Sequence, residues 1–297
     1  MKNTNQPIFI IIATLLFSLL YGCKVEDVKP FAATETYPED RVLKSIVNKK
    51  AMIVIAHDDD MCAMTGTISA LNKDGWEIRV LSLPKGKSRN EAHKRACKNL
   101  LDTVMFFDFE EQNFRLDSTG INYTAVPKEK FKVLFNRSLV KEKLREQVND
   151  FNPSVIFTLD NEIGGYGHPE HVFISQLVLD LAKTDSLNTS YIYQSVYTNH
   201  MESSIMERHS IRMKSWGFPG DGWDKAKEAY KVDGMPEPTV QINISKEAQS
   251  KMDYLKSYNK RERKTMGFFV PAFEDYSAKD YFKIFDREFY RIIKMDE

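Results

Sequence analysis

The amino-acid sequence predicts a single α/β domain with a mainly parallel sheet and helices on both of its faces. Three observations predict this class. Short runs of branched apolar residues recur along the chain, segments of helical periodicity separate them, and no internal repeat or low-complexity tract interrupts the alternation. Such an alternation is typical of parallel sheets with right-handed crossovers.

The clearest strand is expected at 51–56. This run is apolar throughout, as in a strand that is buried on both faces of a parallel sheet. Further strands are expected at 76–83, 103–107, 155–159, 191–197 and 240–244.

The helices are expected where apolar residues recur three and four positions apart. Ser88 and Glu91 have the spacing of a capping box, which predicts a helix that begins at Ser88. Six aromatic residues between Tyr276 and Tyr290 fall at helical spacings and are expected to pack in the core. Helices are expected at 41–48, 61–73, 88–101, 139–151, 171–183, 246–258 and 279–293. We place the resulting Rossmann-like domain at residues 50–297.

The composition is that of a globular protein without a polyanionic partner. Among 297 residues, 42 basic side chains balance 42 acidic ones, and the sequence has no long block of Lys or Arg. Nucleic acid is therefore not expected as a partner. The three cysteines, Cys23, Cys62 and Cys97, lack the spacing of a disulfide scaffold or a CxxC metal site.

The N-terminus has the features of a secretory signal. Lys2 precedes a long apolar run that ends in small residues and Cys23. Cys23 after Leu-Tyr-Gly resembles the bacterial lipobox, which predicts a signal peptide at 1–22 and lipidation of Cys23. Residues 23–49 would then be a tether and lead-in. We expect a lipid-anchored lipoprotein of the cell envelope, outside the cytoplasm; an uncleaved membrane anchor is the alternative.

Two polar clusters follow predicted strands. The first comes after the strand at 51–56 and contains His57 and the three carboxylates of residues 58–60. The second is the stretch 164–171, with the sequence Gly-Gly-Tyr-Gly-His-Pro-Glu-His. Because ligands of open α/β sheets bind beyond the carboxyl ends of the strands, we expect the two clusters to meet.

The combination of residue types favours a metal centre. Two imidazoles and a carboxylate, with a position left for water, form the usual catalytic zinc site. The carboxylates of residues 58–60 alone could be a solvated turn or a Mg²⁺ site, and His168 or His171 alone could be structural. His57 beside these acids favours zinc over Mg²⁺, which prefers an all-oxygen shell.

The two clusters resemble the signature of the PIG-L/LmbE-like zinc-dependent de-N-acetylases. This family has A-H-P-D-D-E after its first strand and a later H-P-D-H or H-x-x-H. This chain has Ala-His-Asp-Asp-Asp-Met at 56–61 and His-Pro-Glu-His at 168–171. The resemblance covers roughly residues 50–295, because Arg89, Glu91 and the expected helix near 251–259 also match.

The resemblance implies a role for each matching residue. It implies the zinc ligands His57, Asp60 and His171, the general base Asp59, the oxyanion stabiliser or proton donor His168, and the substrate-facing side chains Tyr166 and Arg89. Three positions depart from the signature, with Asp58 in place of Pro, Met61 in place of Glu and Glu170 in place of Asp. The change at Met61 removes a supporting carboxylate, and such a loss can weaken metal binding about 10- to 100-fold.

The resemblance implies a zinc-dependent amidohydrolase that removes an N-acyl group, acetyl foremost, from an N-acetylglucosamine-type sugar or glycoconjugate. The expected partner is a small-molecule or glycan substrate. Two alternatives stay open, a noncatalytic glycan-binding lipoprotein with a degenerate site and a Mg²⁺-dependent phosphohydrolase. The remaining histidines and cysteines are expected to be structural or surface residues, namely His93, His200, His209, Cys62 and Cys97.

Overall fold

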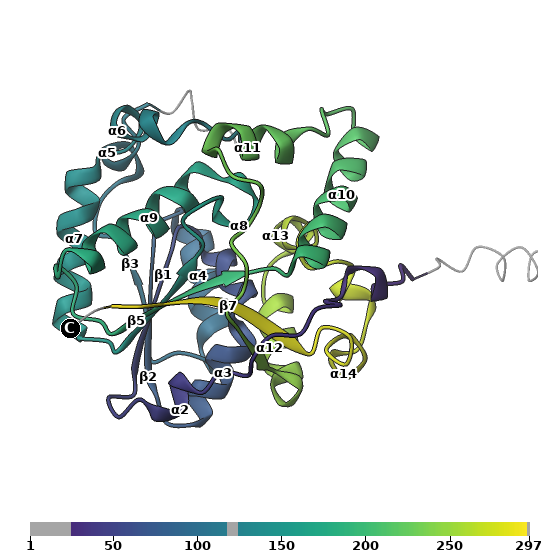
Figure 1. Cartoon of the computed structure of the whole chain (residues 1–297), viewed down its shortest axis with the longest axis horizontal. Coiled ribbons are helices and arrows are strands. Elements are labelled where there is room, and N and C mark those ends of the chain that lie inside the picture. The colour runs from purple at the N-terminus through teal and green to yellow at the C-terminus, as the bar shows by residue number, and fades with distance from the viewer. Residues whose placement is uncertain (1–24, 118–123, 296–297) are drawn as a thin grey trace, which may run out of the picture.

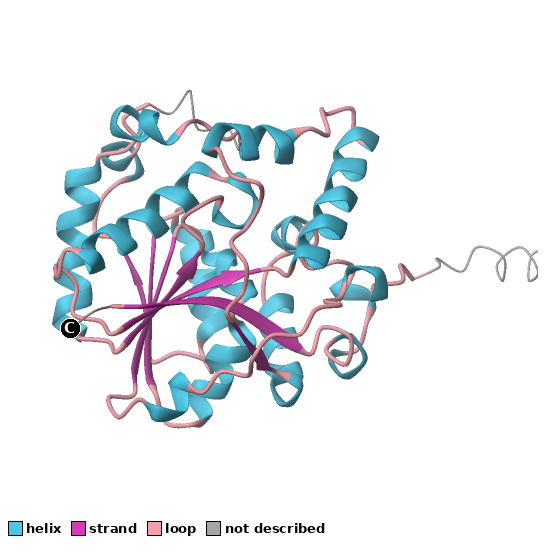
Figure 2. Ribbon diagram, viewed as in Figure 1, coloured by secondary structure: helices cyan, strands magenta, loops and turns pink. Residues whose placement is uncertain are grey.

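The computed structural model describes residues 25–117 and 124–295, and within them seven strands form one sheet (Figures 1 and 2). The strands are β1 (Lys50–Ile55), β2 (Glu77–Ser82), β3 (Thr103–Phe106), β4 (Val155–Leu159), β5 (Tyr191–Val196), β6 (Val240–Asn243) and β7 (Arg287–Lys294). Their order is β3-β2-β1-β4-β5-β7-β6. The first five are mutually parallel, and β7 is antiparallel to both of its neighbours. The predicted mainly parallel sheet is confirmed.

Helices cover both faces of this sheet. The α-helices are α2 (Val42–Ser45), α3 (Thr65–Lys73), α4 (Lys87–Cys97), α5 (Glu111–Phe114), α6 (Phe131–Leu134), α7 (Arg137–Phe151), α8 (Gly164–Gly167), α9 (Pro169–Lys183), α10 (Asn199–Ser215), α11 (Gly222–Tyr230), α12 (Ala248–Lys256), α13 (Lys260–Met266) and α14 (Ala278–Tyr281). Along β1, Ile53 and Ile55 join the core under α3, α4 and α12, whereas Met52 and Val54 join the core under α7 and α9. The alternation follows from the pleat of the strand.

The crevice that holds the site lies where the strand order reverses. From β1 the chain moves outward to β2 and β3, and from β4 it moves the other way to β5. The two strands pair in parallel, with Ile53 opposite Phe157. Their following helices, α3 and α9, pack on opposite faces, so the loops beyond β1 and β4 diverge and leave room for a ligand.

The predicted helix at 279–293 is wrong. Only α14 is helical there, and β7 follows it between β5 and β6. Phe289 and Tyr290 are both buried, because a strand inside a sheet buries the side chains of both its faces. Aromatic residues satisfy either pattern, so their spacing did not distinguish helix from strand. The expected core packing is confirmed for the buried Tyr281, Phe282, Phe289 and Tyr290.

Two helix starts also differ from the predictions. α4 begins at Lys87 behind Gly86, whose φ of 88° ends the preceding loop, and Ser88 lies inside the helix, so the predicted capping box is absent. The long helix α10 was not predicted. It begins at Asn199, after the N-cap Thr198, whose hydroxyl accepts a hydrogen bond from the Met201 amide, and it carries no clean apolar stripe.

The expected tether also needs correction where the structure describes it. Val28 is fully buried in the core, and both Glu26 carboxylate oxygens accept hydrogen bonds from Arg208 on α10, at 2.6 and 2.7 Å. Residues 25–49 therefore pack against the domain. The predicted signal peptide at 1–22 and the lipidation site Cys23 lie outside the described residues. Within 25–117 and 124–295, no helix combines the length and apolar character needed to cross a bilayer.

Candidate functional site

The first cluster begins the turn after β1. A 3₁₀ turn, Asp58–Ala63, follows His57 directly, and the His57 amide donates to Asp60 Oδ2 at 2.8 Å. On the other side of the ring, His57 Nε2 lies 2.7 Å from Glu170 Oε2. The Glu170 carboxylate can only accept a hydrogen bond there, so Nε2 carries the hydrogen and Nδ1 presents its lone pair to the crevice.

The second cluster brings His171 to the same point from the first turn of α9. His171 Nδ1 donates to the carbonyl oxygen of Gly164 at 2.9 Å, which leaves Nε2 as the acceptor. This Nε2 lies 2.9 Å from His57 Nδ1 and 3.1 Å from Asp60 Oδ1. Asp60 Oδ1 is 3.9 Å from His57 Nδ1. Two ring lone pairs and a carboxylate oxygen therefore converge, an arrangement that a cation between them would stabilise.

The donor set fits a borderline metal such as zinc, which binds imidazole nitrogen and carboxylate oxygen. Burial lowers the pKa of His57 well below its usual range, with a further contribution from the Lys85 charge, so that the ring stays neutral and can act as a ligand. Burial alone would raise the pKa of Glu170, but hydrogen bonds from His57 and Arg115 and the Lys85 charge hold it well below its usual range.

His168 extends the group of histidines. Its ring centroid lies 4.7 Å from that of His57 and 4.8 Å from that of His171, and its Nδ1 accepts a hydrogen bond from the Glu170 amide at 3.2 Å. The possible ligand atoms of His57, His168 and His171 lie within 4.8 Å of one another, as do those of His57, Asp59 and Asp60. The donor sets overlap, and His57 belongs to both.

The glycine-rich loop between β4 and α9 is held by Asp160, which sequence reasoning missed. One carboxylate oxygen of Asp160 accepts the amides of residues 162–164 and the other accepts that of Gly165, at 2.7 to 3.1 Å. Gly164 has a φ of 65°, and a Cβ there would lie 2.7 Å from the Cβ of His171. The close approach of backbone to ligand requires glycine at this position.

Asp58, the residue in place of proline, has a defined partner. Arg89 Nη2 lies 2.5 Å from Asp58 Oδ1 and 2.9 Å from Asp59 Oδ1. The hydroxyls of Tyr254 and Tyr258 donate to the backbone carbonyl of Asp58 at 2.7 and 3.2 Å. Arg89 thus fixes the predicted base Asp59, whereas its expected contact with substrate stays a prediction.

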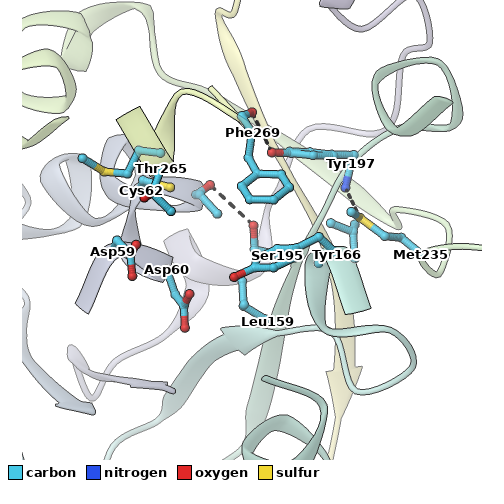
Figure 3. Close-up of a pocket in the computed structure, with 14 residues that line it drawn as sticks. Asp59, Asp60, Cys62, Leu159, Tyr166, Ser195, Tyr197, Met235, Thr265 and Phe269 are labelled. Carbon is cyan, nitrogen blue, oxygen red and sulfur yellow. Dashed lines mark hydrogen bonds between the residues drawn. The ribbon is translucent and has the colours of Figure 1, made fainter. Parts of the chain in front are cut away.

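A pocket opens beside the carboxylates (Figure 3). Asp59, Asp60 and Tyr166 line it together with segments that sequence reasoning did not assign to the site. These further lining residues are Cys62, Ala63, Leu159, Gly165, Ser195, Val196, Tyr197, Met235, Thr265, Met266 and Phe269. The Tyr166 ring stacks on that of Phe269, with centroids 4.2 Å apart and planes at 19°. Tyr166 therefore forms one wall of the pocket.

The structure also shows where Cys62, Cys97, His93 and Met61 lie. Cys62, expected as a buried structural residue, is partly exposed and lines the pocket. Cys97 is buried, as expected. His93 is buried in α4, and within the described residues neither of its ring nitrogens has a hydrogen-bond partner. Met61 is buried in the core, with its sulfur 4.0 Å from that of Cys97. The carboxylate that supports His57 comes instead from Glu170.

Comparison with known proteins agrees with this geometry. Residues 52–182 match the family described as GlcNAc-PI de-N-acetylase, PIG-L. A probable N-acetylglucosaminyl-phosphatidylinositol de-N-acetylase from Dictyostelium discoideum is 28% identical over 143 residues, which are 48% of this chain and 53% of that protein. The chain thus spans about half the length of this curated relative.

Two solved structures are similar more weakly. The N,N'-diacetylchitobiose deacetylase from Pyrococcus horikoshii is 13% identical, with a TM-score of 0.47 over 99% of this chain and 95% of that one. A deacetylase of teicoplanin biosynthesis, solved with teicoplanin, is 12% identical, with a TM-score of 0.49 over 84% of this chain and 100% of that one. The matched segment, residues 52–182, contains both clusters, and through it the chain is similar to the PIG-L family.

Proposed function

We propose that this protein is a zinc-dependent hydrolase that removes an N-acyl group, acetyl foremost, from an N-acetylglucosamine-type sugar or glycoconjugate. The observation that carries the proposal is the convergence of His57 Nδ1, His171 Nε2 and Asp60 Oδ1 beside a pocket lined by Asp59. The match of residues 52–182 to the PIG-L family and the activity for which the Dictyostelium discoideum relative is named support the same reaction class.

The residues that would hold the metal are His57, Asp60 and His171. A bound zinc would supply a Lewis acid and lower the pKa of water to about 7. Glu170 keeps the His57 ring oriented through the 2.7 Å contact at Nε2, and the Gly164 carbonyl does the same for His171. Such partners fix the tautomer and the direction of each ring.

The protein's own groups account for the movement of protons. Asp59, held by Arg89 at 2.9 Å, accepts a proton from the water that attacks the amide carbonyl carbon. The amide C–N bond then breaks, the acyl carbon keeps the hydroxyl, and the amine leaves with a proton. His168 lies beside both ligand rings, where it can stabilise the oxyanion or protonate the amine, and Tyr166 lines the same space.

Metal analysis combined with turnover tests this proposal. The purified protein is reconstituted with Zn²⁺, its metal content is measured, and N-acetylated sugars are screened by mass spectrometry for loss of acetyl. We expect about one zinc per chain and acetyl release, both lost in His171→Ala. Glycan binding without turnover would favour the noncatalytic alternative, and release of phosphate with Mg²⁺ would favour the phosphohydrolase.

We further propose that the protein is anchored outside the cytoplasm by a lipid on Cys23. Residues 1–22 have the charge, the apolar run and the small residue of a lipoprotein signal peptide, in that order. Labelling with radioactive palmitate is expected for the natural sequence and absent for Cys23→Ala. Equal labelling of both would contradict the anchor.

A further inference from the structure

The pocket beside the two carboxylates has mainly apolar walls. Leu159, Val196, Met235, Met266 and Phe269 supply most of them. An acetyl group ends in one methyl and would leave most of this surface uncovered. Unfilled apolar walls forfeit dispersion contacts, so a ligand that covers them gains free energy.

Three hydroxyl groups in these walls are already used as donors. The hydroxyls of Ser195, Tyr197 and Thr265 donate to backbone carbonyls at 3.4, 2.9 and 3.4 Å (Figure 3 draws the first two). A pyranose ring that entered this pocket would bring several hydroxyls and meet few groups ready to donate to it. Burying polar groups without partners is costly. The walls therefore suit a hydrocarbon better than the sugar.

A second cavity adjoins the pocket. The two share six lining residues, Cys62, Ala63, Ser195, Val196, Tyr197 and Phe269. Beyond these, the second cavity is lined by Met201 and Ile205 of α10 and by Phe282, Phe285 and Phe289. The apolar surface thus extends away from the carboxylates, past Cys62, toward α10 and the start of β7.

The charged groups of the second cavity are engaged elsewhere. Lys251 Nζ lies 2.5 Å from Glu288 Oε1, and the two carboxylate oxygens of Glu288 accept the amides of Gly66 and Thr67 at 2.8 and 2.7 Å. Arg287 donates to the carbonyl of Glu35 and to Gln241. These side chains serve the fold and leave the apolar residues to define what the cavity binds.

We propose that the joined cavities receive an N-acyl chain longer than acetyl, so that the preferred substrate is a medium-chain N-acyl amine. The inference rests on the proposed hydrolase function and refines its substrate. The amide carbonyl lies at Asp59 and Asp60, the unbranched chain extends past Cys62 and Ala63 into the second cavity, and the amine half faces solvent. Hydrolysis yields a free fatty acid and the amine.

A series of acyl lengths tests the proposal. The zinc-loaded protein is assayed with N-acetyl-, N-butyryl-, N-hexanoyl- and N-octanoylglucosamine. Each buried methylene is worth about fourfold in kcat/KM, so activity is expected to rise along the series by that factor per carbon until the cavities are filled. Flat or falling kcat/KM from acetyl to octanoyl, with acetyl release present, overturns this inference and leaves the hydrolase intact.

A paired substitution on α10 locates the chain. Ile205 is buried and lines the second cavity, whereas Ile211 on the same helix is 61% exposed. Ile205→Trp is expected to lower the octanoyl-to-acetyl ratio of kcat/KM at least tenfold, and Ile211→Trp to leave it unchanged. If Ile205→Trp does not fold, Met201→Phe takes its place, because it fills the same cavity with a smaller increase in side-chain volume. An unchanged ratio in folded cavity variants contradicts the proposal.

Binding to the metal-free protein gives a readout that does not depend on turnover. Isothermal titration calorimetry is expected to find N-octanoylglucosamine bound at least tenfold more tightly than N-acetylglucosamine, with a more negative heat-capacity change from apolar burial. Equal affinities would overturn the inference. Absence of hydrolysis for every acyl length, together with this preference in binding, would refute the hydrolase and keep the acyl site.

Discussion

The two loops that form the metal centre are stabilised in opposite ways. The loop after β4 is held locally, because Asp160 accepts the amides of the four residues that begin two positions after it. The turn after β1 is held from a distance. Its Asp58 meets Arg89, 31 positions away, and Tyr254 and Tyr258, 196 and 200 positions away.

The two loops are held differently because they have different tasks. The second loop has glycines at positive φ, at Gly164, Gly165 and Gly167, and needs a rigid local frame to aim His168 and His171. The first turn carries three adjacent carboxylates, whose mutual repulsion a nearby cation relieves. Arg89, 30% exposed, supplies that cation. Substitutions at Asp59 and Asp60 of the first turn should therefore act on chemistry, and substitutions at Asp160 on stability.

Asp59→Asn gives the largest expected effect, because it removes the proton acceptor of the first turn and leaves the metal ligands in place. The amide keeps the shape of the side chain and cannot accept the proton, so turnover should fall by about 10²- to 10⁴-fold. Zinc content should stay near that of the natural sequence. Asp60→Asn is the matched control, in which metal binding should fall. Loss of zinc in Asp59→Asn with retention in Asp60→Asn would show that Asp59 is the metal ligand and Asp60 the base.

Asp160→Ala removes the hydrogen bonds that hold the loop after β4. Four amides, two of them buried, lose their acceptor, which should lower the free energy of unfolding by about 3 to 5 kcal/mol. Urea unfolding of the metal-free protein measures the change. Asp160→Asn keeps one acceptor oxygen and should cost less than half as much. Equal stability of Asp160→Ala and the natural sequence would remove Asp160 from this role.

Glu170→Gln tests whether the second loop also orients the ligand of the first. Without the carboxylate, His57 loses the partner that fixes its tautomer, and zinc affinity should fall about 10- to 100-fold. Competition with a chelator measures the affinity. Glu111→Gln is the control, since Glu111 pairs with the same Arg115 at the surface but contacts neither ligand ring. Similar losses in both variants would contradict the assignment.

Asp58→Asn has the smallest expected effect. The substitution weakens the charged contact with Arg89, which is partly solvent-screened, and should lower the free energy of unfolding by about 1 kcal/mol. Zinc content should be unchanged. Glu91→Gln, on the same helix as Arg89 but paired with the exposed Lys94, should change stability by less than about 0.5 kcal/mol. A larger effect at Glu91 than at Asp58 would contradict this account.

The sequence predicted the parallel half of the fold because its strands are rich in branched apolar residues and its helices are amphipathic. The two clusters beyond β1 and β4 were recognisable because each places histidine and carboxylate side chains after an apolar run in the sequence. The C-terminal part was less predictable. β7 contains aromatic and branched residues that pack equally well from a helix, and only its place between β5 and β6 decides its conformation.

The supporting residues of the site were hidden for another reason. Glu170 is 113 positions from His57, and nothing in the local pattern tells that its carboxylate reaches that ring. Asp160 had a local signal, an acid directly before a glycine-rich turn, which is typical of an Asx-type turn. The pocket walls at Tyr197, Met235 and Phe269 are ordinary apolar and aromatic residues, so only the tertiary arrangement assigns them to the site.

The contact between His57 and His171 spans 114 positions of the chain. Contacts of such long sequence separation require closure of a large loop, and here they also require the parallel pairing of β1 with β4. We therefore expect the centre to be completed late on the folding pathway, when most of the sheet has formed. Interactions absent from the folding transition state act on the rate of unfolding. The centre should thus prolong the lifetime of the folded protein and leave the speed of its folding nearly unchanged.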